Sequence, residues 1–102
     1  MLNPKSINAS SIEMVMPRLI AIRLSCELSK AEFADRIGVD RSSYTKMENG
    51  DKPILPHIAS RIWEQFGVDM NYIYLGRMDG LSKNVSSKLI KALKHQNKID
   101  ND

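Results

Sequence analysis

Glycine, proline and helix-capping residues divide this chain into short segments, and this punctuation constrains the fold more than any other feature of the sequence. Gly38, Gly50, Gly67 and Gly76 each follow a stretch of helical character, where a glycine can end a helix in the left-handed conformation. No stretch alternates apolar and polar residues with the β-branched content that is typical of strands. The sequence therefore predicts an all-α fold.

The first helix is predicted from a proline near its start. Residues 1–12, rich in Asn and Ser, are expected to form an N-terminal arm. Pro17 is well suited to the first turn of a helix, which should then run to about Glu27. The apolar stripe of this helix comprises Ile20, Leu24 and Leu28.

Local capping motifs predict the next two helices. Ser29 and Glu32 have the spacing of a capping box, which starts a second helix at the residue after Ser29, and Gly38 ends it. Asp40 is a good N-cap for a third helix over residues 41–49. Only a short turn separates these two helices.

Three further helical segments follow. A fourth helix is expected over residues 56–66, with Trp63 and Phe66 in the core, and a fifth over residues 70–75. Beyond Gly80 a sixth segment has an apolar stripe at helical spacing. The residues of this stripe are Val85, Leu89 and Leu93.

The length of 102 residues suits one domain. The predicted boundaries are an arm over residues 1–12, a helical domain over 13–76 and a lysine-rich, partly helical extension over 77–102. The net charge of +3 is unevenly placed, because residues 83–98 hold five lysines and no acid. Such a segment is compatible with binding to nucleic acid or another polyanion, and equally with a solvated helix face.

Other residue types exclude several classes of function. The longest apolar run, 19–22, is far shorter than the ~20 residues that cross a bilayer, and the first residues lack the pattern of a secretory signal. Cys26 is the only cysteine, which excludes an internal disulfide and a cysteine-based zinc cage. His57 and His95 have no further ligand at helical spacing, and no glycine-rich phosphate loop is present. We therefore expect a cytoplasmic protein with no membrane, metal or cofactor partner and no enzymatic activity.

The second and third predicted helices, joined by residues 37–40, have the form of a helix-turn-helix. On a helical wheel one continuous arc of the third helix is polar. The members of this arc are Arg41, Ser42, Thr45, Lys46 and Asn49. Guanidinium, ammonium, hydroxyl and amide groups on one face have the chemistry needed to read base edges in a DNA major groove. The alternative is the solvated outer face of an ordinary amphipathic helix.

The residues around this turn carry a resemblance to a known family. Residues 28–50, LSKAEFADRIGVDRSSYTKMENG, strongly resemble the motif of the Xre/Cro-type helix-turn-helix family, which has the lambda-repressor-like fold. Residues 68–76, VDMNYIYLG, resemble the fifth helix of that family, so the resemblance covers roughly residues 15–76. It implies a five-helix lambda-repressor-like DNA-binding domain followed by an extra C-terminal helical segment.

The resemblance also implies roles for individual residues. The residues that would contact base edges are Arg41, Ser42, Thr45 and Lys46. The residues that would contact backbone phosphates, and so position the protein without reading sequence, are Lys30, Ser43, Asn49 and Lys52. Arg23 and Glu48 match a pair that forms a buried salt bridge between the first and third helices.

Two residues depart from the family pattern. Lys30 stands where glutamine is common, and lysine keeps a phosphate contact as a point charge but loses the two-way bridge of the amide. Tyr44 stands where a branched aliphatic residue is usual. Its ring is expected to pack inward, with the hydroxyl at the rim and within reach of a partner such as a phosphate.

The implied function is that of a bacterial or phage-type transcription regulator, a repressor that binds double-stranded DNA. A homodimer is expected because one recognition helix contacts only a few base pairs. Candidates for its interface are Tyr72, Ile73, Tyr74, Leu75, Leu89 and Leu93. Two alternatives stay open: an antitoxin that represses its own operon while holding a toxin, and a helical protein-interaction module that has lost DNA binding.

Overall fold

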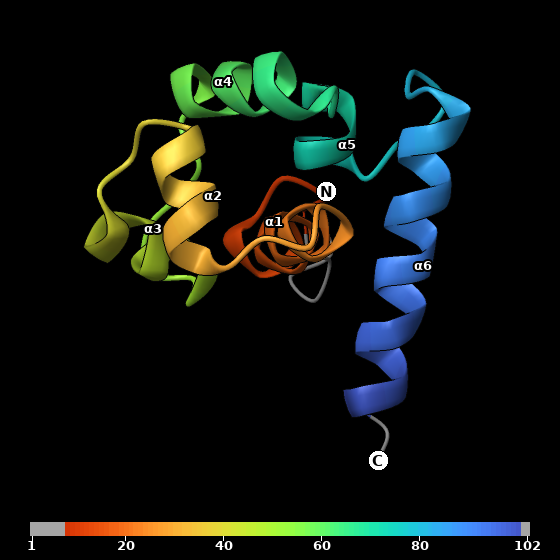
Figure 1. Ribbon diagram of the computed structural model, residues 1–102, viewed down its shortest axis with the longest axis horizontal. Coiled ribbons are helices and arrows are strands. Elements are labelled where there is room, and N and C mark those ends of the chain that lie inside the picture. Colours follow the sequence, from red (N-terminus) through yellow and green to blue (C-terminus); the bar gives the residue numbers. More distant parts are fainter. Residues whose placement is uncertain (1–7, 101–102) are drawn as a thin grey trace, which may run out of the picture.

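The computed structural model describes residues 8–100, and over that range every regular element is an α-helix (Figure 1). The helices are α1 (Ile12–Ser25), α2 (Lys30–Arg36), α3 (Arg41–Glu48), α4 (Pro56–Phe66), α5 (Met70–Leu75) and α6 (Lys83–Asp100). The prediction of an all-α fold is therefore confirmed. Residues 1–7 of the predicted arm and the last two residues of the predicted extension lie outside the described residues.

α1 lies at the centre of the molecule. Figure 1 looks nearly along its axis, and α3, α5 and α6 all pack against it. Its buried residues are Val15, Leu19, Ala21 and Ile22. Of the predicted stripe, Leu28 packs against the core, whereas Ile20 is only half-buried and Leu24 is exposed. Because α3, α5 and α6 pack against different sides of α1, its buried residues do not form the single stripe that helical spacing predicts.

The start of α1 also differs from the prediction. The helix begins at Ile12, and Pro17 lies inside it instead of near its start. A proline at this position has no N–H to donate to the carbonyl oxygen of Glu13, one turn earlier, and such a loss usually ends or kinks a helix. In this structure α1 continues through Pro17 to Ser25 and packs against α3, α5 and α6.

The helix-turn-helix forms as its capping residues predict. Ser29 Oγ accepts a hydrogen bond from the Glu32 N–H at 3.1 Å, and Glu32 Oε1 accepts one from the Ser29 N–H at 3.0 Å. Asp40 caps α3 by accepting from the Ser43 N–H at 3.1 Å. Gly38, between the two helices, has a φ of +68°, a conformation that favours glycine. Local residues thus define where α2 ends and α3 begins.

α4 holds the end of α2 in place. Arg61 Nη1 on α4 donates to the carbonyl oxygens of Ile37 at 3.3 Å and Gly38 at 3.2 Å. The last carbonyls of a helix lack partners within it, so this guanidinium supplies a missing donor. Phe33 on α2 stacks on Phe66 on α4 with ring centroids 4.8 Å apart. α2 is therefore positioned by α4 as well as by its own caps.

The buried face of α4 corrects one prediction. Ile58, Ala59 and Ile62 are buried, and Phe66 packs against the core. Trp63, which was predicted to be in the core, is 57% exposed. It follows Ile62 directly and so lies about 100° around the helix from it, outside the buried face.

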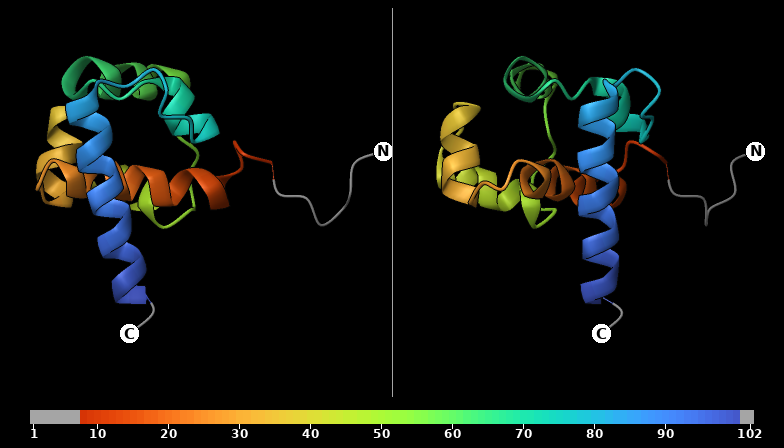
Figure 2. Two further views of the ribbon diagram at one scale, coloured as in Figure 1. Left: turned by 90° about the vertical axis from the view of Figure 1, so that its right-hand side faces the viewer. Right: turned by 45° about the vertical axis from the view of Figure 1, so that its right-hand side comes forward.

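α6 crosses α1 and closes one side of the core (Figure 2). Leu89 is fully buried, and Val85 and Leu93 pack against the core cluster. The apolar stripe of α6 is therefore covered by the same chain. Tyr72 and Ile73 on α5 are also buried. As dimer-interface candidates Tyr72, Ile73 and Leu89 are wrong, because their side chains fill the core of the monomer.

Candidate nucleic-acid interface

α3 has one buried face and one exposed face. Its buried residues are Tyr44, Met47 and Glu48. Its outer residues are Arg41, Ser42 and Lys46, which are exposed, and Thr45, which is half-buried. The helix lies beside α2 at the edge of the molecule (Figure 1). The four residues that were predicted to read bases therefore lie together on the surface, and we call them the outer strip.

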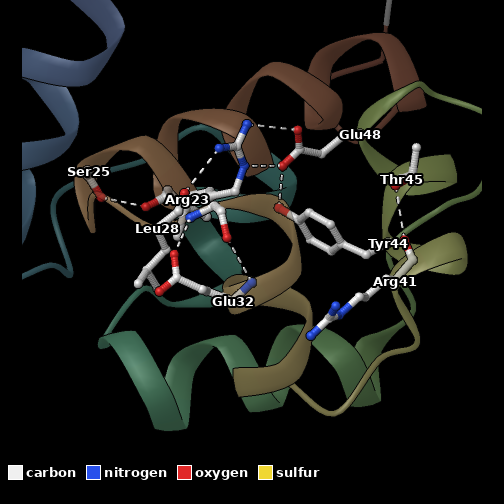
Figure 3. A network of polar contacts seen from close by, with 10 residues as sticks. Arg23, Ser25, Leu28, Glu32, Arg41, Tyr44, Thr45 and Glu48 are labelled. Atoms are coloured by element: carbon white, nitrogen blue, oxygen red, sulfur yellow. Dashed lines mark hydrogen bonds and ion pairs between the residues drawn. The ribbon is translucent and has the colours of Figure 1, made fainter.

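A buried ion pair fixes α3 to α1 (Figure 3). Arg23 donates from Nε to Glu48 Oε2 at 2.7 Å and from Nη2 to Glu48 Oε1 at 3.1 Å. Arg23 Nη1 also donates to the carbonyl oxygen of Leu28 at 3.1 Å, just before α2. The two charged side chains are 13% and 3% exposed. One guanidinium thus connects α1, α3 and the segment that leads into α2.

Tyr44 joins this network from the buried face of α3. Its hydroxyl donates to Glu48 Oε2 (Figure 3), and its ring centroid lies 5.3 Å from that of Phe33. The expectation that the hydroxyl lies at the rim is wrong, because the side chain is fully buried. Burial, and then the hydrogen bond to Glu48, raises the pKa of Tyr44, so the hydroxyl keeps its proton and donates at neutral pH. The hydrogen bond to Glu48 likewise raises the pKa of Arg23.

Arg41 is held by a residue that the sequence analysis missed. Its Nη2 donates to Asp35 Oδ2 at 2.9 Å and its Nε to Asp35 Oδ1 at 3.4 Å. Asp35 lies in the last turn of α2, so this ion pair spans the turn of the helix-turn-helix. The hydrogen bond from Arg41 holds the pKa of the Asp35 carboxyl below its usual value. On the next turn of α3, Thr45 Oγ1 donates to the carbonyl oxygen of Arg41 at 3.0 Å.

The predicted phosphate-contacting residues flank the outer strip. Lys52 Nζ donates to Ser43 Oγ at 3.3 Å, so these two side chains meet. A pocket of about 310 Å³ opens beside them. Lys30 begins α2 and Asn49 follows the last residue of α3, and both are exposed. The structure brings Ser43 and Lys52 together and places Lys30 and Asn49 at separate helix ends.

The comparison with protein families agrees with this geometry. The family model described as helix-turn-helix matches residues 19–73, which is more than half of the chain. This chain belongs to the helix-turn-helix family. The expected Xre/Cro-type, lambda-repressor-like assignment is therefore confirmed. No curated protein and no solved structure matches the chain.

As a member of the helix-turn-helix family, the chain carries a DNA-binding domain that extends from within α1 to within α5. The outer strip and the predicted phosphate contacts lie inside the matched residues, whereas α6 lies beyond them. Over residues 8–100, no group of three or more His, Cys, Asp or Glu side chains is arranged to hold a metal ion. Within the same residues, no helix has the length and apolar character needed to cross a bilayer.

Proposed function

We propose that this protein is a cytoplasmic transcriptional repressor that binds specific double-stranded DNA sequences as a homodimer and inserts α3 into the major groove. One observation carries the proposal. Arg41, Ser42 and Lys46 are exposed on the second helix of a family helix-turn-helix, while the opposite face of that helix is buried. A helix held in this way presents its polar groups to a groove without rearrangement of the core. Repression is proposed because a protein bound over a promoter blocks access to it.

The outer strip contains groups suited to different base edges. Arg41 can donate two parallel hydrogen bonds to guanine O6 and N7, and Lys46 can donate to guanine or to a phosphate. Ser42 offers a hydroxyl to either kind of base, and the Thr45 methyl group suits the methyl group of thymine. This mixture supports recognition of a short sequence with a guanine opposite Arg41.

Positioning on the duplex is assigned to the residues that flank the strip. Because Lys52 donates to Ser43, the two side chains are close enough to contact one phosphate together. The lysine would supply charge and the serine a hydrogen bond. Lys30 and Asn49, at the ends of α2 and α3, are proposed to contact further phosphates along the strand.

The full-length protein is expected to enrich a palindromic sequence from a random duplex library. Two recognition helices related by a two-fold axis would place their half-sites about 34 Å apart. In anisotropy titrations the enriched duplex should bind at least about 10³-fold more tightly than a scrambled duplex. Weak binding that salt abolishes, with no enriched sequence, would refute the proposal, because it would leave only attraction between lysines and phosphates.

The proposed homodimer requires a surface, and the exposed apolar residues narrow the choice. Leu75, the last residue of α5, is 49% exposed. Tyr74 and Leu93, the other remaining candidates, are half-buried. The Tyr74 hydroxyl is already engaged, because it donates to the carbonyl oxygen of Ile54 at 2.6 Å. Leu75 is therefore our candidate for the centre of the contact.

Replacement of Leu75 by aspartate is expected to shift the protein from dimer toward monomer, because a carboxylate is costly to bury in an apolar contact. Light scattering at micromolar concentration, with and without the selected duplex, measures the mass. Leu55→Asp is the matched control for the measurement without duplex, since Leu55 is 50% exposed but lies at the start of α4, and the mass of this variant should not change. A dimer that survives Leu75→Asp would place the contact elsewhere. A wild-type monomer on the selected duplex would rule out the homodimer.

A further inference from the structure

The Arg41 side chain has a defined orientation in the protein alone. It extends from α3 toward α2 (Figure 3), where it meets Asp35 side-on. The contact uses the edge of the guanidinium formed by Nε and Nη2, with donor–acceptor distances of 3.4 Å and 2.9 Å. The end edge, formed by Nη1 and the second N–H of Nη2, is not used by Asp35.

The unused edge of Arg41 is the one that suits a base. It presents two parallel N–H groups, which match the O6 and N7 acceptors of guanine in the major groove. We propose that Asp35 is a positioning residue for base recognition, which holds the Arg41 guanidinium so that this end edge meets a guanine. The inference rests on the proposed function, because it requires Arg41 to read a base.

The Asp35–Arg41 pair is more useful for recognition than for stability. The two side chains are 59% and 67% exposed, and ion pairs this exposed contribute little to folding. A carboxylate beside a DNA-facing surface also repels phosphates, which weakens binding to any sequence. In return, it restricts Arg41 before binding, so less side-chain freedom is lost when a base is contacted. The restriction of Arg41 raises the ratio of specific to non-specific affinity, whereas the repulsion lowers both affinities alike.

A second ion pair in the chain provides a matched control. Arg77 donates from Nη2 to Asp79 Oδ2 at 2.9 Å and from Nε to Asp79 Oδ1 at 3.3 Å, with side chains 63% and 66% exposed. The pair lies in the loop between α5 and α6, on the opposite side of the molecule from α3 (Figure 1). Asp79→Asn therefore removes the same charge from the same kind of contact, far from the outer strip.

The test compares full-length wild type, Asp35→Asn and Asp79→Asn on three duplexes. The first duplex carries the selected sequence, and the third carries a scrambled sequence. The second duplex differs from the first at one G·C pair, which is replaced by A·T. This pair is the one for which the Arg41→Ala variant loses the preference of the wild type. Wild type and Asp79→Asn should prefer the guanine by about 5- to 150-fold, the range for one bidentate contact. Asp35→Asn should reduce that preference by at least about threefold, the cost of ordering one long side chain on binding. It should also bind scrambled DNA about two- to eightfold more tightly at 0.1 M salt.

The outcomes separate this inference from the proposed function. Asp35→Glu restores the carboxylate and should recover part of the guanine preference. Equal preference in Asp35→Asn and wild type would overturn the inference, and so would an equal loss in Asp79→Asn, which would indicate a general effect of charge. If Arg41→Ala keeps every base preference, the inference fails while sequence-specific binding stands. If wild type enriches no sequence, the proposed function itself fails.

Discussion

Replacement of Glu48 by alanine is expected to lower the free energy of unfolding by about 3–5 kcal/mol. The substitution leaves the Arg23 guanidinium, which is 13% exposed, without its bidentate acceptor. It also leaves the buried Tyr44 hydroxyl without the oxygen to which it donates. Both losses are large because water cannot easily replace the missing partner in a buried site.

This loss is a large part of the roughly 5–15 kcal/mol that stabilises an ordinary domain. Because the network joins α1, α3 and the segment before α2, we expect α3 to lose its fixed position as the domain destabilises. Urea unfolding followed by far-ultraviolet circular dichroism measures the change. Tryptophan fluorescence is a poor probe, since Trp63 is already 57% exposed in the folded chain.

Two variants serve as controls for Glu48→Ala. Asp79→Ala removes an acid from an exposed pair and should stay within about 0.5 kcal/mol of wild type. Tyr44→Phe keeps the ring against Phe33 and removes one hydrogen bond, so we expect a loss of about 1 kcal/mol. A loss below about 1 kcal/mol for Glu48→Ala would contradict the burial of the ion pair.

Local hydrogen bonds explain why the short helices could be predicted from the sequence. Ser29, Asp40 and Asp69 each accept an N–H within the first turn of their own helix. A cap of this kind depends on residues within four positions of one another, all of which are visible in the sequence. α2, α3 and α5 accordingly start where they were predicted to start.

Contacts between distant segments explain what could not be predicted. Pro17 was expected near a helix start, but α1 begins at Ile12 and continues through Pro17, and no local signal in the sequence indicates this. The helical spacing of Val85, Leu89 and Leu93 indicates that one face of α6 packs against another element. Periodicity cannot say whether that element belongs to a second copy of the chain or, as in this structure, is α1 of the same chain.

The difference between local patterns and contacts across a turn also decides which residues of the candidate site could be predicted. The outer strip could be predicted because it depends only on the period of one helix. Asp35 could not, because its contact with Arg41 crosses a turn and follows no helical spacing. The hydrogen bond between Tyr44 and Glu48 did have a signal, since residues four apart on a helix are neighbours.

Replacement of Arg41 by alanine is expected to cause the largest change in DNA recognition. Loss of one bidentate contact should cost about 1–3 kcal/mol on the selected duplex, or about 5- to 150-fold in affinity. Stability should stay within about 0.5 kcal/mol of wild type, because Arg41 and its partner Asp35 are both more than half exposed. A loss of binding would therefore not reflect unfolding. Lys46→Ala is expected to act in the same direction.

Lys52→Ala is the matched control for Arg41→Ala, because it removes a positive charge proposed to face a phosphate instead of a base. It should weaken binding to the selected and scrambled duplexes by the same factor and lower the slope of log K against log salt by about 1, as should Lys30→Ala. Anisotropy titrations of both duplexes at two salt concentrations measure these quantities. Arg41→Ala should lower the ratio of selected to scrambled affinity, whereas Lys52→Ala should leave it unchanged. An equal fall in both variants would mean that the outer strip attracts DNA only through its charge and that α3 reads no bases.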